Sequence, residues 1–269
     1  MKRDPLYLSS IICCLAFSAA ILSCSHIDEN ERYINIEPVK PEPESVTRAV
    51  LLEDFTGQRC VNCPRGTEVI EQLQQELGDS LVIAVGIHGG PLGFKGTARA
   101  LGLATDVGDE YYNYWKLEYQ PVGLINRHGA TNYTDWTAEV VKELAKPASL
   151  ALSAKAAING SQVDISITAM GIDGTTNGKL QAWLLEDSIT ALQMMPDGST
   201  NAEYIHNHVL RTPVNGTWGE DVTIHEAEEQ TFTLRQPLDE AWNHRHLSIV
   251  AFVYDSSGVL QVTKASIEK

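Results

Sequence analysis

The chain has 269 residues, of which 43% are apolar, and a formal net charge of −15 at pH 7. This composition is typical of a globular protein with a sizeable core, and the length suggests two domains or one domain with appendages. The negative charge excludes binding to nucleic acid or to anionic membrane surfaces through charge.

The first 23 residues have the pattern of a secretion signal, because a basic start precedes an apolar stretch over residues 6–22. The segment ends in Ile-Leu-Ser-Cys at residues 21–24, which resembles a bacterial lipobox. That resemblance implies that Cys24 is lipidated and anchors the protein, and Ser25 resembles a signal for the outer membrane. We therefore expect a lipid-anchored outer-membrane protein that faces the periplasm or the cell surface. Ordinary cleavage, which gives a soluble periplasmic protein, is the alternative.

Residues 24–48 are polar and acidic and contain Pro38, Pro41 and Pro43. Low hydrophobicity and repeated Pro-Glu steps predict an extended tether rather than a packed element. Acidic residues just after a lipidated cysteine resemble the surface-export signals of Bacteroidota lipoproteins. A plain linker is the alternative.

A C-x-x-C motif follows the first predicted strand, Val50–Leu52, and stands where a helical pattern begins. Cys60 at a helix start, beside the cation of Arg59, is placed to favour thiolate over thiol. Cys60 and Cys63 are also the only unblocked cysteines after processing, so a Cys60–Cys63 disulfide is the default in an oxidising compartment. The motif predicts a redox dithiol, with a structural disulfide as the alternative. A zinc site is disfavoured because no second cysteine pair accompanies the motif.

Asp54 and Phe55 precede Cys60 at an offset that resembles the thioredoxin family. The resemblance implies that Asp54 relays protons, that Cys60 attacks and that Cys63 resolves a mixed disulfide. Its partners would be protein thiols or disulfides of the cell envelope. Arg59 stands where thioredoxins have Trp, so their strongly reducing behaviour cannot be carried over.

Thioredoxin-like sites also face a cis-proline that begins a strand, and Pro121 is the candidate by this resemblance. Gln120 would then offer its backbone groups to an extended substrate strand, with Arg59 beside it. No cofactor is implied.

Residues 49–147 show the order β-α-β-α-β-β-α and predict an α/β thioredoxin-like domain with a helical insertion at about residues 88–118. The order rests on the strand before the motif, a helix over residues 67–77, a strand over 81–87, a hairpin over 122–133 and a last helix from residue 136. His88 is read as a hydrogen-bonded loop histidine rather than a group that tunes the thiolate. The aromatic cluster at residues 111–115 is read as core, with a substrate groove as the alternative.

Residues 148–269 switch to period-2 patterns with turn signals such as Asn159-Gly160. They predict an all-β antiparallel sandwich of immunoglobulin-like type. The steps His206-x-His208 and His244-x-His246 place pairs of histidines on one strand face, but no carboxylate spacing supports a metal ion. Polar packing is therefore favoured, and no metal site is predicted.

The order of lipobox, first domain and sandwich resembles a family of outer-membrane lipoproteins of Bacteroidota, and residues 204–211 look like that family's signature. Two functions remain open at this point. One is a membrane-anchored thiol–disulfide oxidoreductase that acts on secreted proteins through Cys60 and Cys63. The other is a surface-exposed binding or structural lipoprotein, in which the disulfide is structural and the sandwich binds a surface protein or a glycan.

Overall fold

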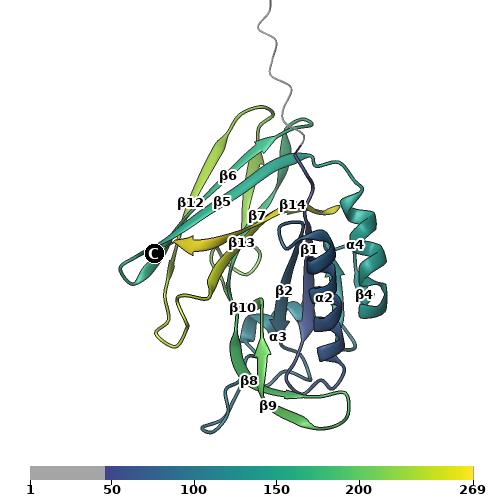
Figure 1. The fold of residues 1–269 in the computed structure, drawn as a ribbon. Coiled ribbons are helices and arrows are strands. Elements are labelled where there is room, and N and C mark those ends of the chain that lie inside the picture. Colours follow the sequence, from purple (N-terminus) through teal and green to yellow (C-terminus); the bar gives the residue numbers. More distant parts are fainter. Residues whose placement is uncertain (1–45, 269) are drawn as a thin grey trace, which may run out of the picture. The chain divides into compact units, whose positions relative to one another are not determined.

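The computed structural model describes residues 46–268, and Figure 1 shows its strands and helices. The helices are α2 (Cys63–Leu77), α3 (Asp106–Tyr114) and α4 (Trp136–Leu144), with a short 3-10 turn, η2 (Tyr133–Asp135), before α4. The strands are β1 (Val50–Thr56), β2 (Val82–His88), β3 (Val122–Ile125), β4 (Ala130–Asn132), β5 (Leu150–Asn159), β6 (Gln162–Gly171), β7 (Thr176–Glu186), β8 (Ile189–Met194), β9 (Thr200–His206), β10 (Val209–Pro213), β11 (Glu220–Ile224), β12 (Gln230–Pro237), β13 (Leu247–Asp255) and β14 (Gly258–Glu268).

Most of these strands belong to one mixed sheet. Its order within the described residues is β12-β6-β5-β14-β13-β7-β10-β2-β1-β3-β4, and β11 adds to β7. Strand β1 pairs in parallel with β2 and antiparallel with β3. Strand β10 joins the two halves, because Val209 pairs with Gly86 of β2 and with Glu186 of β7. The hairpin β8–β9 stands apart as a two-stranded sheet.

Both faces of the central strands are covered, which explains their continuous apolar runs. Alternate residues of β13 point into two different cores: Val250 and Phe252 pack with the β1–β2 side, whereas Ile249 and Ala251 pack with β5 and β6. A third core lies between β1, β2 and the helices α2 and α4, which both lie along the same part of the sheet in Figure 1. The fully buried Trp136 of α4 belongs to this third core.

The predicted fold class, an α/β thioredoxin-like domain plus a separate immunoglobulin-like sandwich, is therefore wrong. The protein is mostly β, and strands from both predicted parts share one large mixed sheet. The physical reason is that β2 uses its second edge to pair with β10, which lies about 120 residues later in the chain. Hydrophobic periodicity identifies a buried strand but not the strand that pairs with it.

The predicted helical insertion at about residues 88–118 is helical only in α3. The preceding loop folds tightly on itself: a Cβ on Gly102 would lie 2.0 Å from the backbone nitrogen of Gly96. Thr105 caps α3 by accepting a hydrogen bond from the Gly108 amide, at 3.0 Å. Glycine permits this close approach of the backbone and disfavours a helix, so the loop interrupts the predicted insertion.

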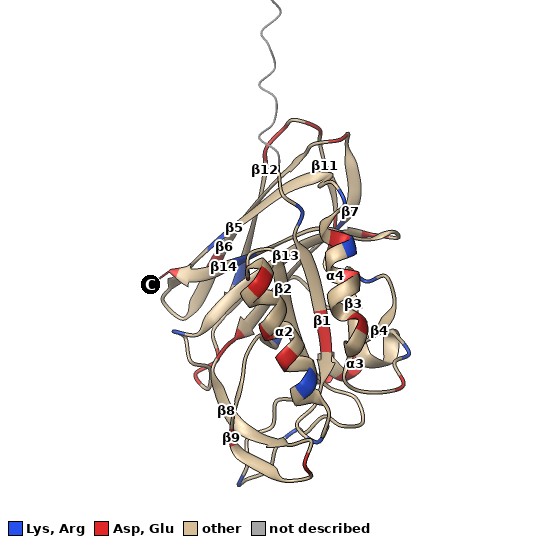
Figure 2. Ribbon diagram, turned by 45° about the vertical axis from the view of Figure 1, so that its right-hand side comes forward, with Lys and Arg blue, Asp and Glu red and all other residues tan. Residues whose placement is uncertain are grey.

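Acidic residues are spread over α2, α4 and the connecting loops rather than gathered on one surface, as Figure 2 shows. Glu53 and Asp54 in the middle of β1 differ from the acidic residues of the helices and loops, because both of their carboxylates are buried. Within residues 46–268, no helix has the length and apolar character needed to cross a membrane.

Candidate functional site

The C-x-x-C motif forms a disulfide at the step from β1 to α2. Cys60 ends a turn in which its amide donates to the Gly57 carbonyl at 3.0 Å, and Cys63 begins α2. The two residues are bonded, with their Cα atoms 5.4 Å apart, and each is only 1% exposed. The expected Cys60–Cys63 pairing is present, and the pair is shielded from solvent.

The hairpin β8–β9 covers this turn. Its Gln193 side chain donates to the Cys60 carbonyl at 2.8 Å and to the Gly57 carbonyl at 3.3 Å. The Met194 amide donates to the Gln58 carbonyl at 2.9 Å. The apolar residues Ile189 and Ala191 anchor the hairpin in a small core with Leu103 and Val209. Polar contacts therefore hold the hairpin against the turn that carries Cys60, and apolar contacts hold it against Leu103 and Val209.

Gln58 ties the same turn to a second loop. Its side chain is fully buried, donates to the carbonyls of Leu101 and Leu192 and accepts from the Leu103 amide at 2.8 Å. A buried amide whose donors and acceptor are all satisfied fixes its surroundings rigidly. The turn is held on two sides by side-chain amides.

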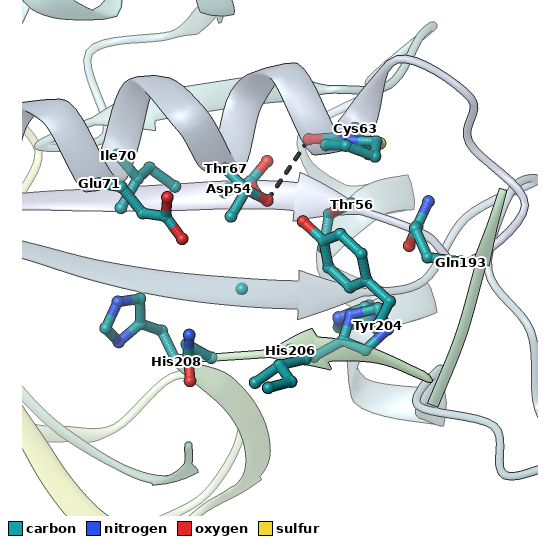
Figure 3. A pocket seen from close by; sticks show the side chains of 15 residues that line it. Asp54, Thr56, Cys63, Thr67, Ile70, Glu71, Gln193, Tyr204, His206 and His208 are labelled. Carbon is teal, nitrogen blue, oxygen red and sulfur yellow. Dashed lines mark hydrogen bonds between the residues drawn. The ribbon is translucent and has the colours of Figure 1, made fainter. Parts of the chain in front are cut away.

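A narrow pocket lies next to the disulfide and is shown in Figure 3. Asp54 of β1 lines it on one side, and Tyr204 and His206 of β9 line it on the other. Its volume of about 40 Å³ holds a few water molecules but no substrate. The full lining is Asp54, Thr56, Cys63, Pro64, Thr67, Ile70, Glu71, Gly86, His88, Gln193, Tyr204, Ile205, His206, Asn207 and His208.

Asp54 is the most perturbed acid of this pocket. The residue is 3% exposed, and its Oδ1 has no hydrogen-bond partner among the described residues. Burial raises the pKa of Asp54 to about 8, so the carboxyl is protonated at neutral pH. The structure thus places Asp54 and Cys63 in one pocket, as the sequence suggested, with the acid in its neutral form.

His88 and His206 pack edge to face with their ring centroids 5.3 Å apart. Burial lowers the pKa of His206 to about 4, and burial together with His206 and Arg211 lowers the pKa of His88. Both rings are therefore neutral at neutral pH. His208 contacts Gln74 instead, and His244 contacts the Asp239 carbonyl, so the H-x-H steps do not converge. Among the described residues, no group of three or more His, Cys, Asp or Glu is arranged to hold a metal ion.

The remaining predicted site residues surround the turn in different ways. The guanidinium of Arg59 lies over the Phe94 ring, 4.9 Å from its centroid. The Gln120–Pro121 bond is cis. The Gln120 side chain donates to the carbonyls of Thr56 and Gly89, at 2.7 and 3.0 Å, so its amide ties the loops together.

The sequence analysis did not predict the contacts of Gln58 and Gln193 with the turn, nor the β8–β9 hairpin that packs against it. A signal was available, because Asp197-Gly198 is a turn pair between two short segments, and Gly198 has a φ of 84°. Residues of β8 also alternate in burial. The alternation is weak in the sequence because the polar Gln193 faces inward.

Comparison with known families decides where the chain belongs. Residues 108–269 match the family described as "Outer membrane protein Omp28". The chain belongs to the Omp28 family. The expected membership of an outer-membrane protein family of Bacteroidota and the expected outer-membrane localisation are confirmed, whereas the thioredoxin-like description is not. Comparison with curated proteins gives no match.

Two solved structures are similar to this Omp28 family member. HBP35 of Porphyromonas gingivalis aligns over 83% of this chain and 76% of its own, with a TM-score of 0.65 and 15% identity, which shows a shared fold. A domain of the outer membrane lipoprotein Omp28 from Porphyromonas gingivalis is 25% identical. That domain aligns over 45% of this chain and 89% of its own, with a TM-score of 0.34.

Proposed function

We propose that this Omp28 family member is a binding or structural protein of the outer membrane, and that its Cys60–Cys63 disulfide is a structural staple. The observation that supports this most directly is the burial of both cysteines beneath the β8–β9 hairpin. A thiolate or a substrate disulfide must reach a sulfur atom to exchange with it, and both cysteines are only 1% exposed. The part of the chain that matches the family, residues 108–269, also contains neither cysteine.

The redox potential of the disulfide tests this proposal. We expect glutathione and dithiothreitol titrations of the folded protein, quenched with an alkylating reagent, to give a potential below about −300 mV. Structural disulfides of secreted proteins fall in that range, because the native fold holds the sulfurs together. A potential between about −120 and −270 mV, the span of working oxidoreductases, would contradict a structural role.

Loosening the hairpin should expose the disulfide. We expect Gln193→Ala to increase the rate at which dithiothreitol reduces the folded protein by about tenfold, because two hydrogen bonds that close the hairpin over the turn are lost. Alkylation and mass spectrometry measure the rate. Gln72→Ala, which removes an exposed glutamine of α2, is the matched control and should react like the wild type. Equal rates for Gln193→Ala and the wild type would mean that the hairpin does not gate access.

A second candidate function, thiol–disulfide exchange, is supported by the Asp54 carboxyl in the pocket of Cys63. In the reduced protein, the Cys60 thiolate would attack a substrate disulfide and release one substrate thiolate. The Cys63 thiolate would then attack the Cys60 sulfur, restore the Cys60–Cys63 disulfide and release the reduced substrate. The hairpin must open for both steps. A Cys63→Ala variant that traps no envelope protein as a mixed disulfide would count against this candidate.

The anchor at Cys24 belongs to the same proposal. Cys24 lies outside the described residues, so its lipidation stays a prediction from the sequence. Incorporation of labelled palmitate, absent in Cys24→Ser, is the measurement that checks it.

A further inference from the structure

An aromatic groove that does not include the disulfide lies between α3, β7 and the turn that joins β13 to β14. Tyr114, Trp115, Trp218 and Tyr254 line it, together with Arg127 and Lys179. Its volume of about 450 Å³ falls within the range of small-molecule sites, which is roughly 300–1,000 Å³. A neighbouring hollow of about 630 Å³ shares Tyr114, Lys179 and Tyr254 with it. The two hollows together can accept an elongated ligand.

Stacked aromatic rings form the wall of this aromatic groove. The Tyr114 and Trp218 rings have centroids 4.1 Å apart and planes tilted by 43°, and Trp115 packs edge-on against Tyr114 at 5.2 Å. Tyr114 is nevertheless 60% exposed. The Tyr254 hydroxyl donates to the Trp218 carbonyl at 2.6 Å and fixes the loop that carries the tryptophan. The groove therefore presents an aromatic surface that is held in place before any ligand arrives.

The two basic residues of the aromatic groove are each paired with a carboxylate from outside its lining, and the lining also contains Asp255, which accepts hydrogen bonds from Ser257. Lys179 Nζ contacts Asp221 at 2.9 Å, and Arg127 contacts Glu53 at 3.2 Å. The Arg127 guanidinium also lies 4.3 Å from the Tyr254 ring centroid. A cationic ligand would meet Lys179 and Arg127, and an anionic ligand would find both already neutralised. An anionic ligand would also meet the Asp255 carboxylate, and a cationic ligand would meet two cations beside that single carboxylate, so the lining favours an uncharged ligand.

Two buried donors of the lining lack acceptors. Nε1 of Trp115 and Nη1 of Arg127 make no hydrogen bond to a described residue, and the Arg127 side chain is only 2% exposed. Buried N–H groups normally have a partner. Because both atoms are buried, a ligand in the groove reaches them only if the side chains of the lining shift.

We propose that the aromatic groove binds a neutral oligosaccharide. Sugar rings have apolar C–H faces that stack on aromatic rings, and their hydroxyl groups both donate and accept hydrogen bonds. Both properties match the exposed Tyr114 ring beside the polar side chains of Lys179, Asp255 and Ser256. This inference rests on the proposed binding function and gives it a site and a ligand class. All of the groove residues named above lie within the segment that matches the family.

The test is a titration of the full chain, in a detergent without a sugar headgroup, with maltotetraose, cellotetraose and chitotetraose. Tryptophan fluorescence and calorimetry report binding, because Trp115 and Trp218 line the groove. We expect at least one of the three to bind with a Kd of about 1 mM or tighter. Tyr114→Ala should weaken it about tenfold, whereas Tyr114→Phe, which keeps the ring, should retain the affinity.

Tyr119→Ala is the matched control, since Tyr119 is exposed but lines neither hollow, and it should bind like the wild type. Absence of binding for all three sugars at about 10 mM would overturn the proposal, as would equal binding by Tyr114→Ala and the wild type or binding of tetramethylammonium in their place. These outcomes do not depend on the redox potential of Cys60–Cys63. If no sugar binds but the disulfide resists reduction, the sugar site is rejected and the structural role of the disulfide still stands.

Discussion

Asp54→Asn is expected to stabilise the folded protein by about 5 kcal/mol at pH 9 and to leave its stability nearly unchanged at pH 4. Burial raises the pKa of Asp54 from 3.8 to about 8, so the folded state binds one more proton than the unfolded state between these values. The free energy of unfolding contributed by this group is therefore fully present below about pH 4 and is lost as the pH rises toward 8. The neutral amide of Asn has no such pH dependence.

Urea unfolding at several pH values from 4 to 9, compared between Asp54→Asn and the wild type, measures this effect. The quantity to compare is the difference in the free energy of unfolding between Asp54→Asn and the wild type, because His206 changes the stability of both with pH in the opposite direction. Its lowered pKa of about 4 makes the wild type more stable as the pH rises from 4 to 6.5. Glu71→Gln, which removes an exposed carboxylate from the rim of the same pocket, is the matched control and should stay within about 0.5 kcal/mol of the wild type. Parallel pH profiles for Asp54→Asn and the wild type would show that the carboxyl is ionised in the fold.

The sequence predicted the local elements better than their arrangement. The apolar runs of β1, β2 and β13 and the stripe of α2 identify these elements because burial leaves a direct pattern in the chain. The unbroken apolar run Ile249–Val253 already argued against a sandwich, because strands with one solvated face alternate between apolar and polar residues. Its two faces contact different cores, and one of those cores contains residues of the first predicted domain.

The site was predicted in part for a similar reason. Cys60, Cys63 and Asp54 are close in sequence, so a local motif was enough to bring them together. Gln193 approaches from more than 130 residues away through the β8–β9 hairpin, and no local pattern specifies that contact. The contact changes the interpretation of the motif, because it turns an accessible dithiol into a covered one.

Arg127→Met is expected to lower the free energy of unfolding by about 3–5 kcal/mol. Arg127 donates from Nε and Nη2 to the Glu53 carboxylate at 3.2–3.3 Å, and both side chains are at most 2% exposed. Removing this cation, which lies over the rings of Trp183 and Phe252, leaves the buried Glu53 carboxylate without its partner. Burial already raises the pKa of Glu53 even against the opposing charge of Arg127, so the lone carboxyl must fold in its protonated form.

The double variant Glu53→Gln/Arg127→Met separates the loss of a charge partner from the loss of packing. Since the amide carries no charge, the double variant should recover most of the stability that Arg127→Met loses at pH 7. The single variant should also regain stability as the pH falls toward 4, because the unfolded Glu53 then binds its proton as well. Urea unfolding followed by tryptophan fluorescence measures both effects. If Arg127→Met loses less than about 1 kcal/mol, or if the double variant is as unstable as the single one, the guanidinium stabilises the core by filling space rather than by neutralising Glu53.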